Sequence, residues 1–293
     1  MRHTRHDLIM RVVTYNIQFG RGKDECFDIE RIASETRGAD IIAMQEVERF
    51  GERSGAVDQV AELVNLFPTY HCVYGPGLDL DASTIDEAGH VQNRRWQFGN
   101  LLMSRTPILS SRNHPLPKLD LGEQLSIQRS AIEGVVDCSC GPVRIYSVHL
   151  GHQSGTEREH QVARLLQVHH QAGTEGGVLS GGRDLSDWAS QALVPPATAD
   201  AILLGDFNAE PDSREYAMIV AAPADDNPLG GFVDAWRIAG DDADDGITDP
   251  SDGGARIDYA FVTTTLADRV RRAHVDQHAV GSDHQPLWLE IDL

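Results

Sequence analysis

Short apolar runs recur along the whole chain and predict its strands. Most are rich in valine, isoleucine and leucine, which favour extended structure. Several are apolar at nearly every position, as expected for strands that are covered on both faces. The runs occupy residues 10–15, 41–45, 101–104, 127–136, 143–148, 201–204, 257–262 and 287–291.

Helical patterns lie between these runs, with apolar side chains recurring every three or four positions. They occupy residues 27–37, 57–66, 156–170 and 213–220. Helices and strands alternate early in the chain, whereas strands follow strands through the middle and at the end. This order favours an α/β fold of mixed sheets with helices outside them over a purely parallel α/β fold. No internal repeat is visible, so residues 1–293 are expected to form a single domain.

Residues 172–199 differ from the rest, being rich in glycine, serine and proline. A loop insertion of this length is commonly functional or disordered. A plain surface insertion is the simpler interpretation, while Trp188 would suit a lid over a site. Trp188 and Trp96 are also candidates to stack on a base or a sugar, whereas Trp288 is expected in the core.

The composition is that of an ordinary soluble protein. The chain has 293 residues, of which 41% are hydrophobic, enough for a sizeable core. No run reaches the roughly 18 uninterrupted apolar residues of a membrane span, and the first residues lack the pattern of a secretory signal. A cytoplasmic protein is therefore expected. The cysteines show neither zinc spacing nor a disulfide framework, and free thiols are expected at Cys26, Cys72, Cys138 and Cys140.

The formal net charge is −20 at pH 7. Proteins that grip long stretches of nucleic acid usually carry an excess of lysine and arginine. The chain is therefore poorly suited to tight, nonspecific DNA binding. Arg94, Arg95 and Arg129 could supply local positive charge near a site, although a surface salt bridge is the more common use of such residues.

The stretch at residues 201–212 ends a buried strand in Asp206 and Asn208. Alternate residues of a strand share a face, so both side chains are expected on the same side, at the mouth of the sheet. A plain turn before Pro211 would explain the same two residues.

Similar polar residues stand at or beside the ends of other apolar runs. Strand ends at one rim of a sheet are where open α/β folds gather their sites, so these residues are expected to meet. They are Asn16, Glu46, His149, Asp258, Asp283 and His284.

The residue types predict a hard cation and phosphate chemistry. Oxygen donors from Glu46, Asp283, Asn16 and Asp206 suit Mg²⁺, with Mn²⁺ as a second choice. Zinc is disfavoured, because the motifs contain neither cysteines nor closely spaced histidine pairs. The histidines at 169 and 170 are expected to face solvent on a helix.

A buried aspartate can orient a basic imidazole and favour its charged form. Asp258 and His284 are the candidates for this pair, with His284 accepting a proton from water. A metal would then polarise a phosphoryl oxygen.

Taken together, the motifs resemble those of the endonuclease/exonuclease/phosphatase superfamily. They appear in the family's order and span nearly the whole chain. The matching stretches are TYNI (14–17), QEVE (45–48), GNLLMSR (99–105), QRSAI (128–132), SVHLGHQ (147–153), GDFNAEPDS (205–213), RIDYAFV (256–262) and SDHQPL (282–287).

The resemblance implies a four-layer α-β-β-α sandwich, in which two packed mixed sheets carry helices on their outer faces. It also implies roles for the site residues. Glu46 would be the principal metal carboxylate, with Asn16 and Asp283 completing the metal site directly or through water. The implied catalytic residues are His284 as base, oriented by Asp258, His149 on the scissile phosphate, and Asp206 and Asn208 positioning the nucleophile or phosphate.

The function favoured by this set is a Mg²⁺-dependent hydrolase of phosphate esters, acting as a phosphodiesterase or phosphatase on a small molecule or lipid headgroup. With a histidine at position 149, the chain resembles the deoxyribonuclease and phosphodiesterase branches of the family. An endonuclease or exonuclease acting on DNA or RNA is therefore an alternative. A catalytically inactive protein that binds a phosphorylated ligand is another. Whether Asp206 or His284 is the base stays open.

Overall fold

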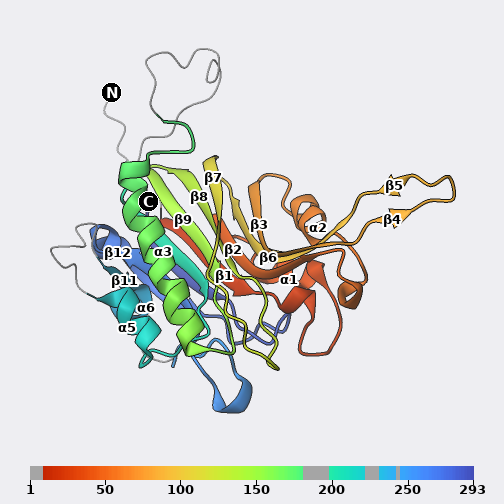
Figure 1. Cartoon of the computed structure of the whole chain (residues 1–293). Coiled ribbons are helices and arrows are strands. Elements are labelled where there is room, and N and C mark those ends of the chain that lie inside the picture. Colours follow the sequence, from red (N-terminus) through yellow and green to blue (C-terminus); the bar gives the residue numbers. More distant parts are fainter. Residues whose placement is uncertain (1–8, 181–197, 222–230, 242–244) are drawn as a thin grey trace.

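Two six-stranded sheets pack face to face in the computed structural model, with helices on their outer faces (Figure 1). The structure describes residues 9–180, 198–221, 231–241 and 245–293. The strand order is β13-β14-β1-β2-β6-β3 in the first sheet and β11-β12-β10-β9-β8-β7 in the second. Strands β1 and β2 are parallel, as are β9 and β10, while the other neighbours are antiparallel. The predicted four-layer α-β-β-α sandwich is confirmed.

The strands of the first sheet are β1 (Ile9–Asn16), β2 (Ile41–Arg49), β3 (His71–Asp81), β6 (Arg95–Ser104), β13 (Val270–Val275) and β14 (Leu287–Asp292). Those of the second are β7 (Ile108–Pro115), β8 (Ser130–Cys138), β9 (Gly141–His149), β10 (Ala201–Asp206), β11 (Phe232–Asp234) and β12 (Asp258–Thr263). The short strands β4 (Thr84–Ile85) and β5 (Val91–Gln92) pair with each other.

The α-helices are α1 (Ile29–Glu35), α2 (Gln59–Leu66), α3 (Gly155–Glu175), α5 (Arg214–Val220) and α6 (Ala235–Ala239). Each begins after a capping residue whose side-chain oxygen accepts a hydrogen bond from a backbone N–H of the first turn. These N-caps are Asp28, Asp58, Ser154, Ser213 and Asp234. Short 3₁₀ turns span Gln18–Gly20, Glu52–Ser54, Ser251–Gly253 and Thr264–Arg269.

The near-continuous apolar runs arise because the interior strands are buried on both faces. In β2, Ile41 and Ala43 pack between the sheets, while Ile42 and Met44 face the layer of α1 and α2. Strand β10 behaves in the same way, with alternate residues facing the other sheet or the layer of α3 and α5. Both faces of these strands therefore contact apolar layers. Their sequences show no alternation of polar and apolar residues for this reason.

Helix α3 reaches Glu175 and thus includes the first residues of the stretch predicted as a loop. Trp188, the residue considered for a lid, lies outside the described residues. The expectation that His169 faces solvent is wrong, because this side chain is 1% exposed and its ring lies 4.8 Å from that of Phe232. His169 is on the face of α3 that packs against the second sheet, together with Leu165 and Ala172.

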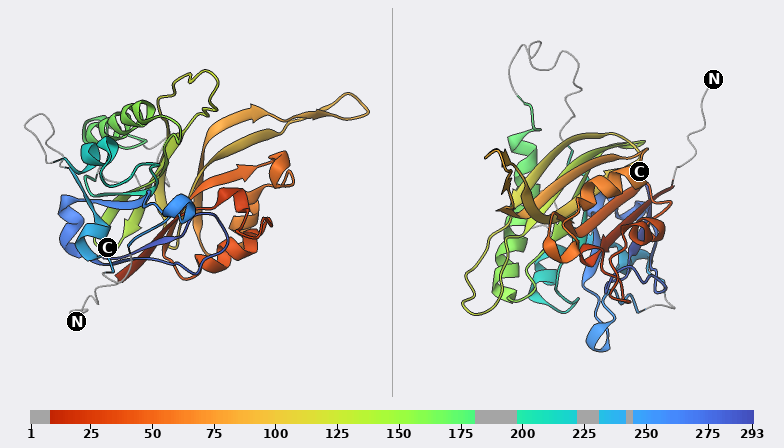
Figure 2. Two further views of the ribbon diagram at one scale, coloured as in Figure 1. Left: turned by 90° about the horizontal axis from the view of Figure 1, so that it is seen from below. Right: turned by 90° about the vertical axis from the view of Figure 1, so that its right-hand side faces the viewer.

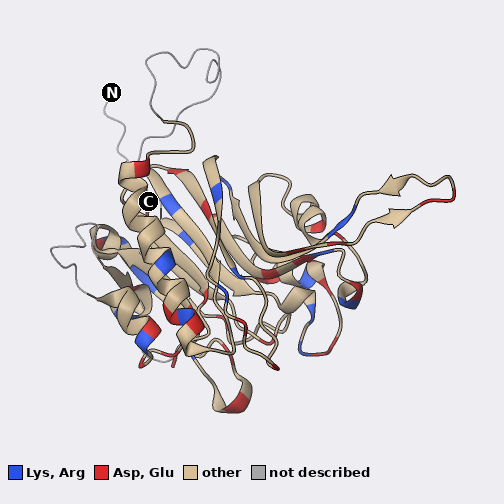
Figure 3. Cartoon of the chain, viewed as in Figure 1, with Lys and Arg blue, Asp and Glu red and all other residues tan. Residues whose placement is uncertain are grey.

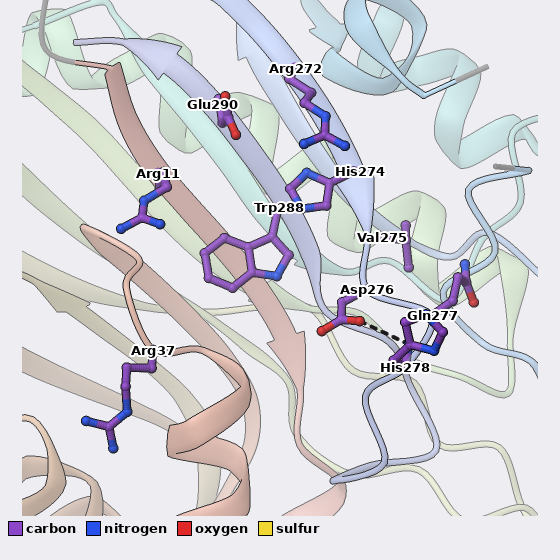
Figure 4. A pocket seen from close by; sticks show the side chains of 10 residues that line it. All are labelled: Arg11, Arg37, Arg272, His274, Val275, Asp276, Gln277, His278, Trp288 and Glu290. Atoms are coloured by element: carbon purple, nitrogen blue, oxygen red, sulfur yellow. Dashed lines mark hydrogen bonds between the residues drawn. The ribbon is translucent and has the colours of Figure 1, made fainter. Parts of the chain in front are cut away.

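Trp288 is only partly buried, which corrects its assignment to the core. Its ring packs beside the core of the first sheet and also lines an open groove on the outer face of β13, β14 and β1. Figure 4 shows Arg11, Arg37 and Arg272 around it. Among the lining residues there is no member of the site predicted from the sequence.

All of the cysteines are free thiols, as predicted. Across the described residues, no helix is both long and apolar enough to cross a membrane. Strands β3 and β6 continue beyond the sheet into an arm capped by β4 and β5, and this arm projects from the body of the protein (Figures 1 and 2). Its tip is exposed, with Ile85 and Val91 on the surface.

Candidate active site

Three of the predicted site residues lie side by side in the second sheet. Asp206 ends β10 and is in register with His149 on one side and with Asp258 on the other. The close approach of β9 and β10 here depends on Gly205. A Cβ atom at this position would lie 1.9 Å from the carbonyl oxygen of Val148, and its φ of 145° suits glycine. The sheet therefore delivers a histidine and two carboxylates to one rim.

Glu46 reaches the same rim from the first sheet through a distortion of β2. The pairing of β2 with β6 shifts register between Met44 and Val47, and Glu46 has a positive φ of 60°. A β-bulge of this kind redirects a side chain out of the regular alternation. The carboxylate of Glu46 is thus turned toward the second sheet, where its Oε1 lies 4.0 Å from Nε2 of His149.

Asn16 connects the two sheets at the rim. Its Nδ2 donates hydrogen bonds to Oε1 of Glu46 at 3.2 Å and to Oδ2 of Asp206 at 3.0 Å. Its Oδ1 accepts a hydrogen bond from the backbone N–H of Gln18. The amide therefore holds two carboxylates apart and presents its donor, not its oxygen, to them.

A buried polar contact lies directly beneath this level. Gln45 Nε2 donates to Oγ of Ser147 at 3.0 Å, and Ser147 Oγ donates to the carbonyl of Met44 at 3.2 Å. Thr14 completes the group by bonding to Gln45. We call Thr14, Gln45 and Ser147 the intersheet pin. It joins the strand that carries Glu46 to the strand that carries His149.

Asp258 and His284 form the pair predicted from the sequence. Nδ1 of His284 lies 2.8 Å from Oδ2 of Asp258, and the opposite ring nitrogen, Nε2, lies 3.8 Å from Oδ2 of Asp206. Burial by itself lowers the pKa of His284, but the charge and hydrogen bond of Asp258, with Asp206, raise it well above 6.5. Burial and the charge of Asp258 also raise the pKa of Asp206. Both shifts favour the protonated forms of His284 and Asp206.

Arg129 lies within the cluster, in contact with His149. Of the two uses considered for it, local positive charge near a site and a surface salt bridge, its position fits the first: it is 6% exposed, and its Nη1 lies 3.0 Å from Nδ1 of His149. Arginine can only donate, so Nδ1 of His149 accepts and Nε2 carries the hydrogen. Burial, and then the charge of Arg129, lower the pKa of His149 well below 6.5. His149 is therefore a neutral hydrogen-bond donor that faces the two carboxylates.

Asn208 joins the site by a turn and not by strand alternation. Strand β10 ends at Asp206, and Asn208 has a positive φ of 49°. Its backbone N–H donates to Oδ1 of Asp206 at 2.8 Å, and its Nδ2 donates to the carbonyl of Leu150 at 3.2 Å. The turn considered at the sequence level is present, and it also fixes Asp206.

Asp283 lies at the exposed edge of the cluster. Its Oδ2 accepts a hydrogen bond from Nε2 of Gln18 at 2.6 Å, and its Oδ1 accepts one from Oγ of Ser282 at 3.1 Å. Burial is the main reason why the pKa of Glu46 is raised, and the charge of Asp283 adds to this effect. The two carboxylates are therefore electrostatic neighbours.

The oxygen donors around Glu46 fit a hard divalent cation. Mg²⁺ keeps several of its waters and takes one or two carboxylates, so its site needs access to solvent. The Glu46 side chain is 20% exposed, and Asp283 is exposed. Ligand atoms of Asp206, Asp258 and His284 also lie within 4.8 Å of one another. That group is buried, and the Asp258–His284 hydrogen bond occupies two of its donor atoms, so the Glu46 side is the better match.

The structure thus brings together all the residues predicted from the sequence, places the candidate Arg129 beside them, and adds Gln18 and Ser282. Arg129 belongs to the QRSAI stretch, and Ser282 precedes Asp283, so both lay within recognised motifs. The choice between the two uses of Arg129 could not be made from the sequence, because sequence position does not reveal burial. Nothing in the sequence pointed to Gln18, because its contact, Asp283, lies 265 positions away along the chain.

The fold is an α/β sandwich with carboxylates and histidines gathered at one rim. The sequence profile described as "Endonuclease/Exonuclease/phosphatase family" matches residues 13–284, and the chain belongs to this family. Members of the family are generally phosphoester hydrolases. Among proteins with curated descriptions, none matches this sequence.

Solved structures agree on the fold. A mannosyl-6-phosphatase from Bacteroides thetaiotaomicron VPI-5482 is 19% identical, with a TM-score of 0.67 over 97% of this chain and 100% of that one. A family protein from Beutenbergia cavernae DSM 12333 is 21% identical, with a TM-score of 0.64 over 97% of this chain and 72% of that one. TDP2 from D. rerio, complexed with a single-strand DNA product, is 16% identical, with a TM-score of 0.60 over 98% and 100%.

Proposed function

We propose that the protein is a Mg²⁺-dependent hydrolase of phosphate esters, acting on a phosphomonoester or phosphodiester of a small molecule or lipid headgroup. The observation that carries this proposal is the chain of contacts from Asp258 through His284 to Asp206. It ends 3.3 Å from His149, beside Glu46. A proton acceptor, a neutral donor and a cation-binding carboxylate thus face one point.

The residues divide the work as follows. His284, held by Asp258, accepts a proton from the attacking water, and Asp206 orients that water or shares the proton. Nε2–H of His149 donates to a nonbridging oxygen of the phosphate. Arg129 keeps His149 in that tautomer. A divalent cation held by Glu46 and Asp283 would supply charge neutralisation at the phosphoryl oxygen.

Asn16 connects the carboxylate proposed to bind the cation with the carboxylate next to the proposed base. It touches both Glu46 and Asp206, so it fixes the distance between the cation side and the proton side of the site. The Oδ1 atom of Asn16 accepts a hydrogen bond from the N–H of Gln18. Direct binding of the cation by this oxygen would require the side-chain amide to rotate.

The charge distribution supports a small substrate over nucleic acid. Lysine and arginine are interspersed with aspartate and glutamate over the ribbon in Figure 3, and the net charge is −20. Arg95, one of the candidates for local positive charge, pairs with Asp79 at 2.7 Å. The protein therefore lacks the excess of lysine and arginine that usually binds a long polyanion such as nucleic acid.

The test is hydrolysis of a panel of phosphate monoesters and diesters with Mg²⁺ or Mn²⁺, with His284→Ala as the matched inactive control. Metal-dependent phosphate release by the wild type alone is expected. Release equal in both proteins would contradict the proposal. Nicking of supercoiled plasmid, abolished by chelation and by Asp206→Ala, would support the nuclease alternative. Ligand binding without any turnover would support the inactive binding protein.

A further inference from the structure

A groove of about 760 Å³ lies at the base of the projecting arm. Its walls come from the segment after β2, from the start of the arm and from β6. Phe50, Arg53, Arg94 and Trp96 are the aromatic and cationic members of its lining. None of them belongs to the catalytic cluster described above.

A buried carboxylate organises two of these residues. Glu48 is fully buried, and its Oε1 accepts hydrogen bonds from Nε1 of Trp96 at 3.0 Å and from Nε of Arg53 at 3.0 Å. Its Oε2 accepts one from Oγ of Ser54 at 2.6 Å. A buried charge is costly unless it is well paired, so its partners are held firmly. Glu48 fixes the indole ring of Trp96 at the edge of the groove.

The groove and the catalytic cluster are neighbours, separated by the buried side chain of Phe98. The guanidinium of Arg53 lies 3.9 Å from the centre of the Phe19 ring and 5.2 Å from that of Phe98. The Phe98 ring is in turn 6.5 Å from the ring of His149. An ester with its phosphate at His149 would have to extend across Phe98 for its organic part to lie in the groove.

The side chains that line the groove favour a flat ring over an anionic group as its occupant. The charge of Arg53 is balanced by Glu48, and Glu52 and Asp81 also line the walls. Arg94 lies 4.7 Å over the ring of Phe50, and within the described residues it makes no ion pair. Indole and guanidinium planes both stack well on flat unsaturated rings.

We propose that this groove binds the organic part of the substrate and selects phosphate esters that carry a flat unsaturated ring, such as a heteroaromatic base. Trp96 stacks on the ring, Arg94 donates hydrogen bonds to its edge, and Glu48 is a positioning residue that holds Trp96. This inference rests on the proposed function for the phosphate, but the groove itself binds the ring without turnover.

The first experiment measures binding alone. Affinities for adenosine and for ribose, which differ by the base, are determined by ligand-observed NMR on the wild-type chain, Trp96→Ala and Trp96→Phe. Stacking on one aromatic ring predicts that Trp96→Ala weakens adenosine binding by about fivefold or more. Trp96→Phe keeps a ring and loses the bond to Glu48, so it should bind adenosine within about twofold of the wild type.

Two results would overturn the inference. One is equal binding of adenosine and ribose by the wild type, which would mean that the groove does not select a flat ring. The other is equal loss in both Trp96 variants, which would trace the effect to the Glu48 hydrogen bond and not to stacking. Thermal unfolding of each variant shows whether it is folded.

The second experiment compares kcat/KM for adenosine 5′-monophosphate and ribose 5-phosphate, which share the same type of phosphate ester. The wild type should prefer the nucleotide, and Trp96→Ala should reduce that preference by about fivefold or more while leaving ribose 5-phosphate within about twofold. If neither of these two esters is hydrolysed but adenosine binds through Trp96, turnover of these esters is excluded while the selection of a flat ring by the groove stands.

Discussion

His284 and Asp258 share a hydrogen bond of 2.8 Å in the buried floor of the site. The aspartate fixes the imidazole so that its other nitrogen faces Asp206. Replacing Asp258 by asparagine keeps the size of the side chain but removes the charge. We expect Asp258→Asn and His284→Ala each to lower kcat by a factor on the order of 10² or more, as for the loss of general-base help.

These losses are measured as steady-state turnover of whichever phosphate ester the wild type hydrolyses. Asp137→Asn is the matched control, since Asp137 is exposed on β8. Its turnover should equal that of the wild type. Unchanged turnover in both site variants would remove His284 from the role of base.

The pH dependence follows from the same pair. A base must be neutral, so activity is present above the pKa of His284 and is lost as the pH falls through it. Because Asp258 raises the pKa of His284 well above 6.5, the acidic limb of the activity profile should lie above pH 6.5. In Asp258→Asn this limb should move to lower pH by about one unit or more. Profiles of kcat against pH at saturating Mg²⁺ locate the acidic limb in the wild type and in Asp258→Asn. Acidic limbs at the same pH in the two proteins would contradict the assignment.

Removal of the divalent cation should abolish turnover and lower thermal stability. A cation that binds only the folded chain raises Tm with its concentration. Mg²⁺ should therefore raise the Tm of the wild type, and Glu46→Gln should need far more Mg²⁺ for the same rise. Asp252→Asn, which removes an exposed carboxylate elsewhere, should behave as the wild type. An identical Mg²⁺ response in Glu46→Gln would exclude Glu46 as a ligand.

Arg129 should control the state of His149. In Arg129→Met the guanidinium that lies 3.0 Å from Nδ1 is gone, so His149 should protonate more readily and lose its fixed tautomer. We expect kcat/KM to fall by about tenfold or more. NMR titration of the histidine side chains should show a higher pKa for His149. An unchanged His149 titration would mean that burial alone keeps this ring neutral.

Gly205 should be the least replaceable glycine of the site. Its missing Cβ would meet the carbonyl of Val148 at 1.9 Å, in backbone that neither strand can easily move. Gly205→Ala should therefore lower the free energy of unfolding by about 3 kcal/mol or more. Gly173→Ala is the control, because it lies in α3 with no atom within 4 Å of its added Cβ. It should be stabilising by about 0.5 to 1 kcal/mol in urea denaturation.

The apolar runs identified the interior strands of both sheets and missed the edges. Strands β3, β7, β11 and β13 lie at the ends of the two strand orders, and none was predicted. Edge strands are covered less completely and so carry polar residues, as in VRRAHV of β13. The periodicity that marks a strand comes from burial, so it is weakest where burial ends.

The site was more predictable than the surfaces around it. Asp206 and His149 follow apolar runs, and adjacent strands bring them into register, so a pattern in the sequence leads directly to their contact. The burial of Arg129 and His169 depends on layers that only the folded chain assembles. Trp288 was misplaced for the same reason, since an outer sheet face without a covering helix cannot be recognised from its own strand.

The intersheet pin has a consequence for how such a site can change. Glu46 and His149 belong to different sheets, so their spacing depends on the offset between the two sheets. The hydrogen bonds of Gln45 and Ser147 have directions, so they lock the offset of the two layers directly below the rim. Loops around the rim are then free to diverge and to accept new substrates, while the reacting groups keep their spacing.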